Sequence, residues 1–210
     1  MTGIGQGYIQ TTPIQLCLMT AQLANGGFKI YPKIVLDPNQ ETVEEIKSKM
    51  LSEVETNEED IKSRFNSGIF FGDESKKYQA LFRNKENVKF VLNAMFRSTN
   101  EVYGTSFSSR IEDPKYQFAG KTGTAQVKRI TEAERELDLE TNQIPYKQRD
   151  HAWFIAFGPY KKPRYAMSIL VEHGGSGSKA AAPIAKKLFK LVIDRHEMRE
   201  KLKKNNSVKI

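Results

Sequence analysis

The sequence predicts an α+β fold in which an antiparallel sheet packs between helices, and three observations support this class. Extended apolar segments follow one another at residues 116–127, 151–157 and 165–171. The last two are joined by a short loop that contains prolines 159 and 163, as expected of a hairpin. Helical periodicity precedes and follows these segments, and consecutive strands flanked by helices are typical of a layered α+β fold.

The first predicted helix begins at Thr12 and Pro13. Threonine is a favoured N-cap residue and proline is favoured at the first helical position. The helix is expected to end at Asn25-Gly26-Gly27, where glycine can adopt a left-handed conformation. Because the helix is apolar on nearly every side, we expect it to be buried. Residues 28–36 are predicted to form a short extended segment, interrupted at Pro32.

Residues 37–67 are predicted to form a solvated acidic insertion, since nine acids but only two lysines lie between residues 37 and 60. A second helix is expected over residues 85–98. Its apolar face carries Val88, Val91, Leu92 and Met95 at helical spacing. Tyr103-Gly104-Thr105 is read as a turn.

The last helix is predicted over residues 180–194, after a charged excursion at residues 128–150 and a glycine-rich turn at residues 174–177. The chain is expected to form one domain part over residues 1–195, followed by a basic tail at 196–210. The net charge is +8, yet the basic residues are scattered, so we expect no nucleic-acid partner. A lone Cys17 and three histidines without ligand spacing predict neither a metal nor another cofactor.

The most informative peptide is Gly120-Lys121-Thr122-Gly123-Thr124-Ala125-Gln126. A phosphate-binding loop is rejected, because its first glycine would fall at position 115, which is a lysine. An unremarkable edge strand with a solvated lysine remains open. The third reading is the Lys-Thr-Gly strand of penicillin-interacting serine enzymes. There, a cation beside hydroxyl groups binds a substrate carboxylate, and a backbone N–H meets the developing oxyanion.

The surrounding segments favour the third reading. Four of them resemble the transpeptidase domain of class B penicillin-binding proteins, most closely the penicillin-binding protein 2 group that elongates rod-shaped bacteria. They are the Gly3-Ile4-Gly5-Gln6-Gly7-Tyr8 start, the Ala119–Val127 strand, Asp150–Phe157, and Val171–Gly177 followed by the alanine-rich helix. The resemblance covers nearly the whole chain apart from residues 37–67 and the basic tail.

This resemblance implies a peptidoglycan D,D-transpeptidase, which cross-links D-Ala-D-Ala stem peptides through a serine ester and is trapped by β-lactams. It implies that Lys121 and Thr124 are catalytic, and that Thr122, Gly123, Thr124 and Gln126 bind substrate. His151 and His173 are expected to orient or pack rather than act as bases. The resemblance also implies a cell-wall elongation complex as partner. It implies a membrane anchor in an upstream part and a location on the periplasmic side of the membrane.

The chain departs from the family at the nucleophile. Ser-x-x-Lys and Ser-x-Asn should both precede residue 1, so we expect the 210 residues to be inactive alone. Ser176-Gly177-Ser178-Lys179 and Ser98-Thr99-Asn100 match these patterns in the wrong order and are interpreted as accidental. Two alternatives stay open: a non-catalytic assembly module of the same fold, or a related β-lactamase or β-lactam sensor.

Overall fold

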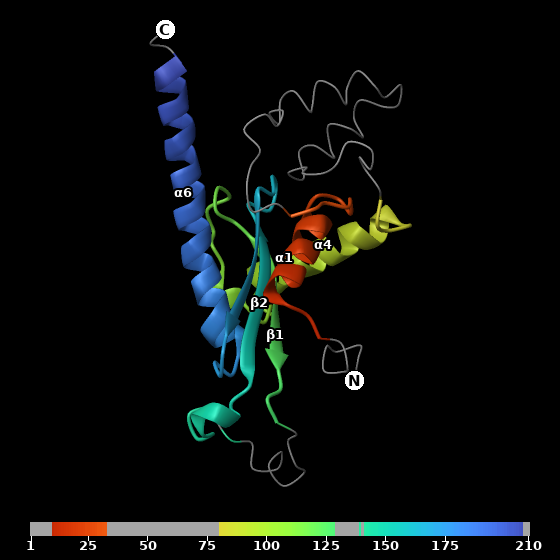
Figure 1. Cartoon of the computed structure of the whole chain (residues 1–210), viewed down its shortest axis with the longest axis vertical. Coiled ribbons are helices and arrows are strands. Elements are labelled where there is room, and N and C mark those ends of the chain that lie inside the picture. The colour runs from red at the N-terminus through yellow and green to blue at the C-terminus, as the bar shows by residue number, and fades with distance from the viewer. Residues whose placement is uncertain (1–9, 33–79, 129–138, 140, 208–210) are drawn as a thin grey trace.

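A three-stranded antiparallel sheet lies at the centre of the fold, in the order β1 (Ala119–Ala125), β2 (His151–Gly158), β3 (Tyr165–Val171). The computed structural model describes residues 10–32, 80–128, 139 and 141–207, with side chains described as far as residue 202. Helices cover both faces of the sheet (Figure 1). The predicted α+β class is therefore confirmed, whereas the acidic insertion at 37–67 lies outside the described residues.

The alternation of side chains along β2 separates two hydrophobic cores. Ala152, Phe154 and Ala156 are completely buried in one cluster, together with Phe118 and Phe189. The intervening Ile155 and Phe157 belong to a second cluster on the opposite face. Successive side chains of a strand point to opposite faces, so β2 supplies both cores at once.

The first core is closed by η5 (Gly177–Ala181), a single π-helical turn, and by α6 (Ala182–Ser207). Alanines 181, 182 and 185 are fully buried, which lets the helix approach the sheet closely. The Phe189 ring stacks on Phe118 with ring centroids 4.9 Å apart. α6 continues thirteen residues past the predicted end at 194, and its C-terminal part extends beyond the sheet (Figure 1).

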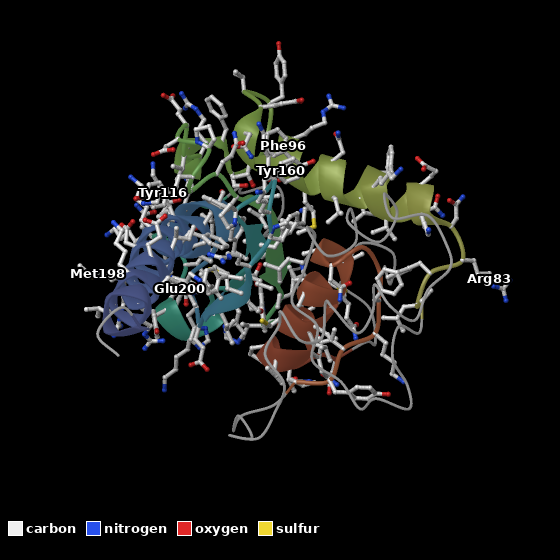
Figure 2. The ribbon with its side chains drawn as sticks, turned by 90° about the horizontal axis from the view of Figure 1, so that it is seen from above. Arg83, Phe96, Tyr116, Tyr160, Met198 and Glu200 are labelled. Atoms are coloured by element: carbon white, nitrogen blue, oxygen red, sulfur yellow. The ribbon has the colours of Figure 1, made fainter. Side chains whose placement is uncertain are left out.

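A polar clasp ties α6 to the segment before β1. The Tyr116 hydroxyl donates to Asp194 Oδ1 at 2.6 Å, and Lys115 Nζ lies 3.0 Å from Asp194 and 2.9 Å from Glu197. The hydrogen bond from Tyr116, followed by that from Lys115, holds the pKa of the Asp194 carboxyl below its ordinary value. Figure 2 shows Tyr116 beside α6 and Met198 further along that helix, on its outer side.

The second core is closed by α1 (Pro13–Ala24) and α4 (Lys85–Asn100). Both helices are capped as their sequences suggest. Thr12 and Gln15 form a reciprocal capping box, and Asn84 Oδ1 accepts from the Glu86 N–H at 2.8 Å. The Phe96 and Tyr160 rings, side by side in Figure 2, lie 4.2 Å apart and link α4 to the loop after β2.

The prediction that α1 is buried needs correction, and the apolar face of α4 is covered unevenly. α1 is not buried on every side, since Ile14 is 60% exposed and Met19 is 39% exposed, while its buried residues are Thr20, Leu23 and Ala24. On α4, Val91 is exposed although Val88 and Met95 are buried. Periodicity indicates which residues share a face, but only the packing of the described elements decides how much of that face is covered.

The end of α1 is built as predicted. Gly26 and Gly27 have φ angles of 91° and 93°, a left-handed conformation that glycine adopts without strain. Asn25 Oδ1 accepts from the N–H groups of Gly27 and Phe28 at 3.1 and 2.9 Å. Of the strand predicted at 28–36, the described part contains an isolated bridge between Phe28 and Ala80, and residues 33–36 lie outside the described residues.

Candidate functional site

The predicted site residues lie on β1, whose two halves differ in burial. Ala119 and Gly120 are buried, whereas Lys121 and Thr124 are exposed and Thr122 and Gly123 are half-buried. Among the described strands, β1 pairs with β2 alone, with Lys121 opposite Ile155 and Gly123 opposite Trp153. The polar half of β1 therefore lies at an edge of the described sheet, where another chain or a peptide can approach it.

The direction of the backbone groups follows from the contacts of α4. Asn100 Nδ2 donates to Phe118 O at 2.9 Å, and Thr99 Oγ1 lies 3.5 Å from Gly120 O. These carbonyl groups thus point away from β2, toward the edge of β1 that β2 does not pair with. Because backbone groups alternate sides along an antiparallel strand, the N–H and C=O groups of Thr122 and Thr124 are expected to point toward that edge as well.

Lys121 and Thr122 bring an ammonium group and a hydroxyl group together. Lys121 Nζ donates to Thr122 O at 2.7 Å and lies 3.5 Å from Thr122 Oγ1. The Thr122 hydroxyl also lies 3.2 Å from the hydroxyl of Thr105, on the segment that follows α4. A cation with adjacent hydroxyl groups can bind a carboxylate through charge-assisted hydrogen bonds. Thr105 was predicted only as part of a turn, and no local sequence signal places it beside residue 122.

Close backbone packing supports the same half of β1 from beneath. A Cβ atom added at Gly177 would overlap Trp153 O and lie 2.8 Å from Gly123 O, so η5 begins directly against the backbones of β1 and β2. At Gly123 itself an added Cβ would lie 3.2 Å from the Trp153 Cβ, a tight but smaller conflict. Glycine at 177 thus permits an approach that a side chain would prevent.

Gln126, the last residue predicted to bind substrate, follows β1 and is exposed. The next residue is held by Asp150, whose Oδ1 accepts from the Val127 N–H at 3.3 Å. Gln126 therefore lies beyond the paired part of the strand but on a backbone anchored to the start of β2.

His151 and His173 form a structural pair at the ends of β2 and β3. The His173 N–H donates to His151 Nδ1 at 2.9 Å, and the two ring centroids lie 4.7 Å apart. His173 has a φ of 54°, and its Nδ1 lies 3.0 Å from Arg149 O. These contacts fit the expected packing and orienting role. Within the described residues, no group of three or more His, Cys, Asp or Glu side chains could hold a metal ion.

The two out-of-order motifs occupy structural positions. Ser176 Oγ and Ser178 Oγ lie 2.9 Å apart at the start of η5, and Lys179 of the same motif is exposed. In the other motif, Asn100 Nδ2 donates to Phe118 O just before β1, and Ser98 Oγ lies 3.2 Å from Thr105 Oγ1. Their interpretation as accidental catalytic motifs stays a prediction.

Among the described residues, no helix has the length and apolar character that crossing a membrane requires.

Comparison with known proteins agrees with this arrangement. The family described as the penicillin binding protein transpeptidase domain matches residues 1–190. The chain is 31% identical over 192 residues to the peptidoglycan D,D-transpeptidase MrdA of Salmonella typhimurium, covering 91% of this chain and 26% of that protein. The corresponding protein of Haemophilus influenzae is 29% identical over 187 residues, with coverage of 89% and 24%. The chain thus spans about a quarter of the length of these relatives.

Solved structures show the same fold. The penicillin-binding protein 2 of Pseudomonas aeruginosa, in complex with WCK 5153, is 30% identical and superimposes with a TM-score of 0.52 over 88% of this chain and 30% of that chain. The penicillin-binding protein 2 of Helicobacter pylori is 27% identical, with a TM-score of 0.52 and coverage of 90% and 26%.

Proposed function

Because the chain belongs to the penicillin binding protein transpeptidase domain family, we propose that it forms the substrate-carboxylate wall of a peptidoglycan D,D-transpeptidase. The observation that carries this proposal is the polar half of β1, where Lys121 Nζ lies 3.5 Å from Thr122 Oγ1 at an edge of the described sheet. Thr124 is exposed two residues further along, and its N–H group is expected to point toward the same edge.

The proposed reaction is acyl transfer from a stem peptide that ends in D-Ala-D-Ala. A serine oxygen attacks the carbonyl carbon of the penultimate residue, the peptide bond breaks, and the terminal D-alanine leaves with a proton. An amine of a second stem peptide then attacks the ester, forms the cross-link and releases the serine. β-Lactams present the same carbonyl and carboxylate, so they acylate the same serine.

The proposal assigns roles to the polar half of β1 and to Gln126, which follows the strand. Lys121, with the hydroxyl groups of Thr122 and Thr124, binds the terminal carboxylate of the substrate. The Thr124 N–H donates to the oxyanion that forms during attack. Gly123 keeps the strand free of a side chain where the substrate backbone lies, and Gln126 lines the extension of the groove. The serine and its lysine base come from polypeptide outside the 210 residues.

The proposal also covers the cellular location and the partners of the protein. The named relatives are peptidoglycan D,D-transpeptidases, and peptidoglycan is a polymer of the bacterial cell wall. We therefore propose that this domain works on the periplasmic side, within a cell-wall elongation complex and with a membrane anchor that polypeptide outside the 210 residues supplies.

The experiment uses the longer protein that carries this chain, labelled with a fluorescent penicillin and separated on a gel. Lys121→Ala should lower the labelling rate about a hundredfold, because the β-lactam carboxylate loses its charge-assisted partner. Lys162→Ala, an exposed lysine on the β2–β3 loop, is the matched control and should label normally. Equal labelling of both variants would contradict the proposed role of Lys121.

The lifetime of the label separates the transpeptidase from the alternatives. A transpeptidase hydrolyses the penicilloyl ester slowly and stays labelled, whereas a β-lactamase hydrolyses it quickly and consumes the drug. A wild-type protein that is never labelled would instead favour a non-catalytic assembly module.

A further inference from the structure

Thr105 lies where it can control the hydroxyl of Thr122. Its Oγ1 is 3.2 Å from Thr122 Oγ1 on one side and 3.2 Å from Ser98 Oγ on the other. The three hydroxyl groups thus form a chain that runs from the last turn of α4 to the edge strand β1. Lys121 Nζ approaches the Thr122 end of that chain at 3.5 Å.

The backbone around Thr105 is anchored on both sides. A Cβ atom at Gly104 would overlap Ser98 O and lie 2.6 Å from Arg97 O, so the preceding residue fits against α4 only without a side chain. The following residue, Ser106, donates to Ser98 O through both its N–H and its hydroxyl at 3.0 Å. Thr105 is therefore presented to β1 from a fixed turn rather than from a loosely held loop.

The number of protons and lone pairs on a hydroxyl group decides which hydrogen bonds these three hydroxyl groups can make. A threonine hydroxyl has one proton to donate and two lone pairs that accept. A lysine ammonium only donates, so the Lys121 contact engages a lone pair of Thr122 Oγ1. If Thr105 also donates to Thr122, the single proton of Thr122 stays free for an acceptor that arrives at the open edge. A carboxylate is such an acceptor.

We propose that Thr105 is a positioning residue for carboxylate binding, which fixes the Thr122 side chain and, backed by Ser98, orients the Thr122 hydroxyl as a donor toward the bound carboxylate. Chains of hydrogen bonds polarise one another, so donation from Ser98 to Thr105 strengthens the next donation in the same direction. This inference rests on the proposed function for its ligand, but the orientation of Thr122 can be measured without any ligand.

The test compares Thr105→Val, Thr105→Ser and Ser108→Ala in the 210-residue chain. Valine keeps the shape of threonine but removes the hydroxyl, serine restores it, and Ser108 is an exposed hydroxyl residue on the same segment, in η3 (Phe107–Ser109). The first readout is the χ1 angle of Thr122, from scalar couplings of its methyl carbon to the backbone nitrogen and carbonyl carbon. The second is the affinity for N-acetyl-D-alanyl-D-alanine, from chemical-shift titration.

In Thr105→Val, the χ1 couplings of Thr122 should become averaged and the affinity should fall about fivefold, the effect of one neutral hydrogen bond. Thr105→Ser should restore both values to within about twofold of the wild type. Ser108→Ala should change neither. Thr122 couplings and affinity that are the same in Thr105→Val as in the wild type would overturn the inference.

The two proposals fail in different ways. If Thr105→Val disturbs the Thr122 couplings, Thr105→Ser restores them, and yet the wild type binds no dipeptide, then Thr105 positions Thr122 and the proposed substrate is wrong. If the wild type binds the dipeptide and Thr105→Val binds it equally well, the substrate stands and the positioning role is rejected.

Discussion

Residues 118–120 and residues 121–125 form two halves of one extended segment, and they differ sharply in burial and polarity. Phe118, Ala119 and Gly120 are buried, and α4 side chains contact the carbonyl groups of Phe118 and Gly120. From Lys121 to Ala125 the same strand is half-buried or exposed and carries polar side chains. The first half fixes where the strand lies, and the second half presents chemistry at an edge. Substitutions in the first half should therefore affect folding, and those in the second half should affect binding.

The largest effect is expected for Phe118→Ala. Phe118 is fully buried, stacks on Phe189 and meets the edge of Phe154. Its removal leaves a cavity between β1 and α6, and the free energy of unfolding should fall by about 3–5 kcal/mol. Urea denaturation followed by circular dichroism measures the change. Phe90→Ala, at a phenylalanine that is 75% exposed on α4, is the matched control and should stay within about 0.5 kcal/mol of wild type.

The next effect contrasts two glycines of the same strand. At Gly120 an added Cβ would overlap the Phe154 ring and lie 2.8 Å from Ile155 O, so Gly120→Ala should cost about 1–3 kcal/mol through overpacking. At Gly123 the nearest atom is 3.2 Å away, so Gly123→Ala should cost less stability. Denaturation midpoints that rank the two variants in the opposite order would contradict the division of β1 into two halves.

Lys121→Ala should leave folding almost unchanged. The side chain is exposed and its described hydrogen bonds reach only its neighbour Thr122. The free energy of unfolding should therefore stay within about 0.5 kcal/mol of wild type, while carboxylate binding is lost. A large loss of stability would show that Lys121 is a structural residue, and the polar half of β1 would then need another explanation.

The smallest effect concerns the clasp on α6 and its pH dependence. The pKa of Asp194 is lowered in the folded chain, chiefly by the Tyr116 hydrogen bond, so its stabilising contribution is present above the ordinary carboxyl pKa of about 4 and is lost as the pH falls through the folded value. Asp194→Asn should lower the urea midpoint slightly at neutral pH and make no difference in strong acid. An equal difference at both pH values would exclude this linkage.

Much of the scaffold was predictable because its signals are local. The start of α1 at Thr12-Pro13, the extent of β3 and the position of Lys121 on a strand all follow from short patterns. The end of α6 was not, because a run of lysines, arginines and glutamates was interpreted as a tail. These residues are also good helix formers, and the helix continues to Ser207.

The candidate site was only partly predictable for a different reason. Lys121, Thr122 and Thr124 belong to one peptide, so a motif can reveal them. Thr105 lies seventeen residues before Thr122, and its contact depends on the close approach of Gly104 to α4. No local sequence pattern predicts such a contact. It becomes visible only when α4, the following turn and β1 are placed together.

The central claim is that the exposed half of β1 binds a substrate carboxylate, and the most direct measurement is a chemical-shift titration of the 210-residue chain. N-acetyl-D-alanyl-D-alanine is compared with the same dipeptide ending in a carboxamide, which lacks the charge. The account predicts shifts centred on the amides of residues 121–126, with about tenfold weaker binding of the carboxamide. Shifts that lie elsewhere, or equal binding of the two dipeptides, would contradict it.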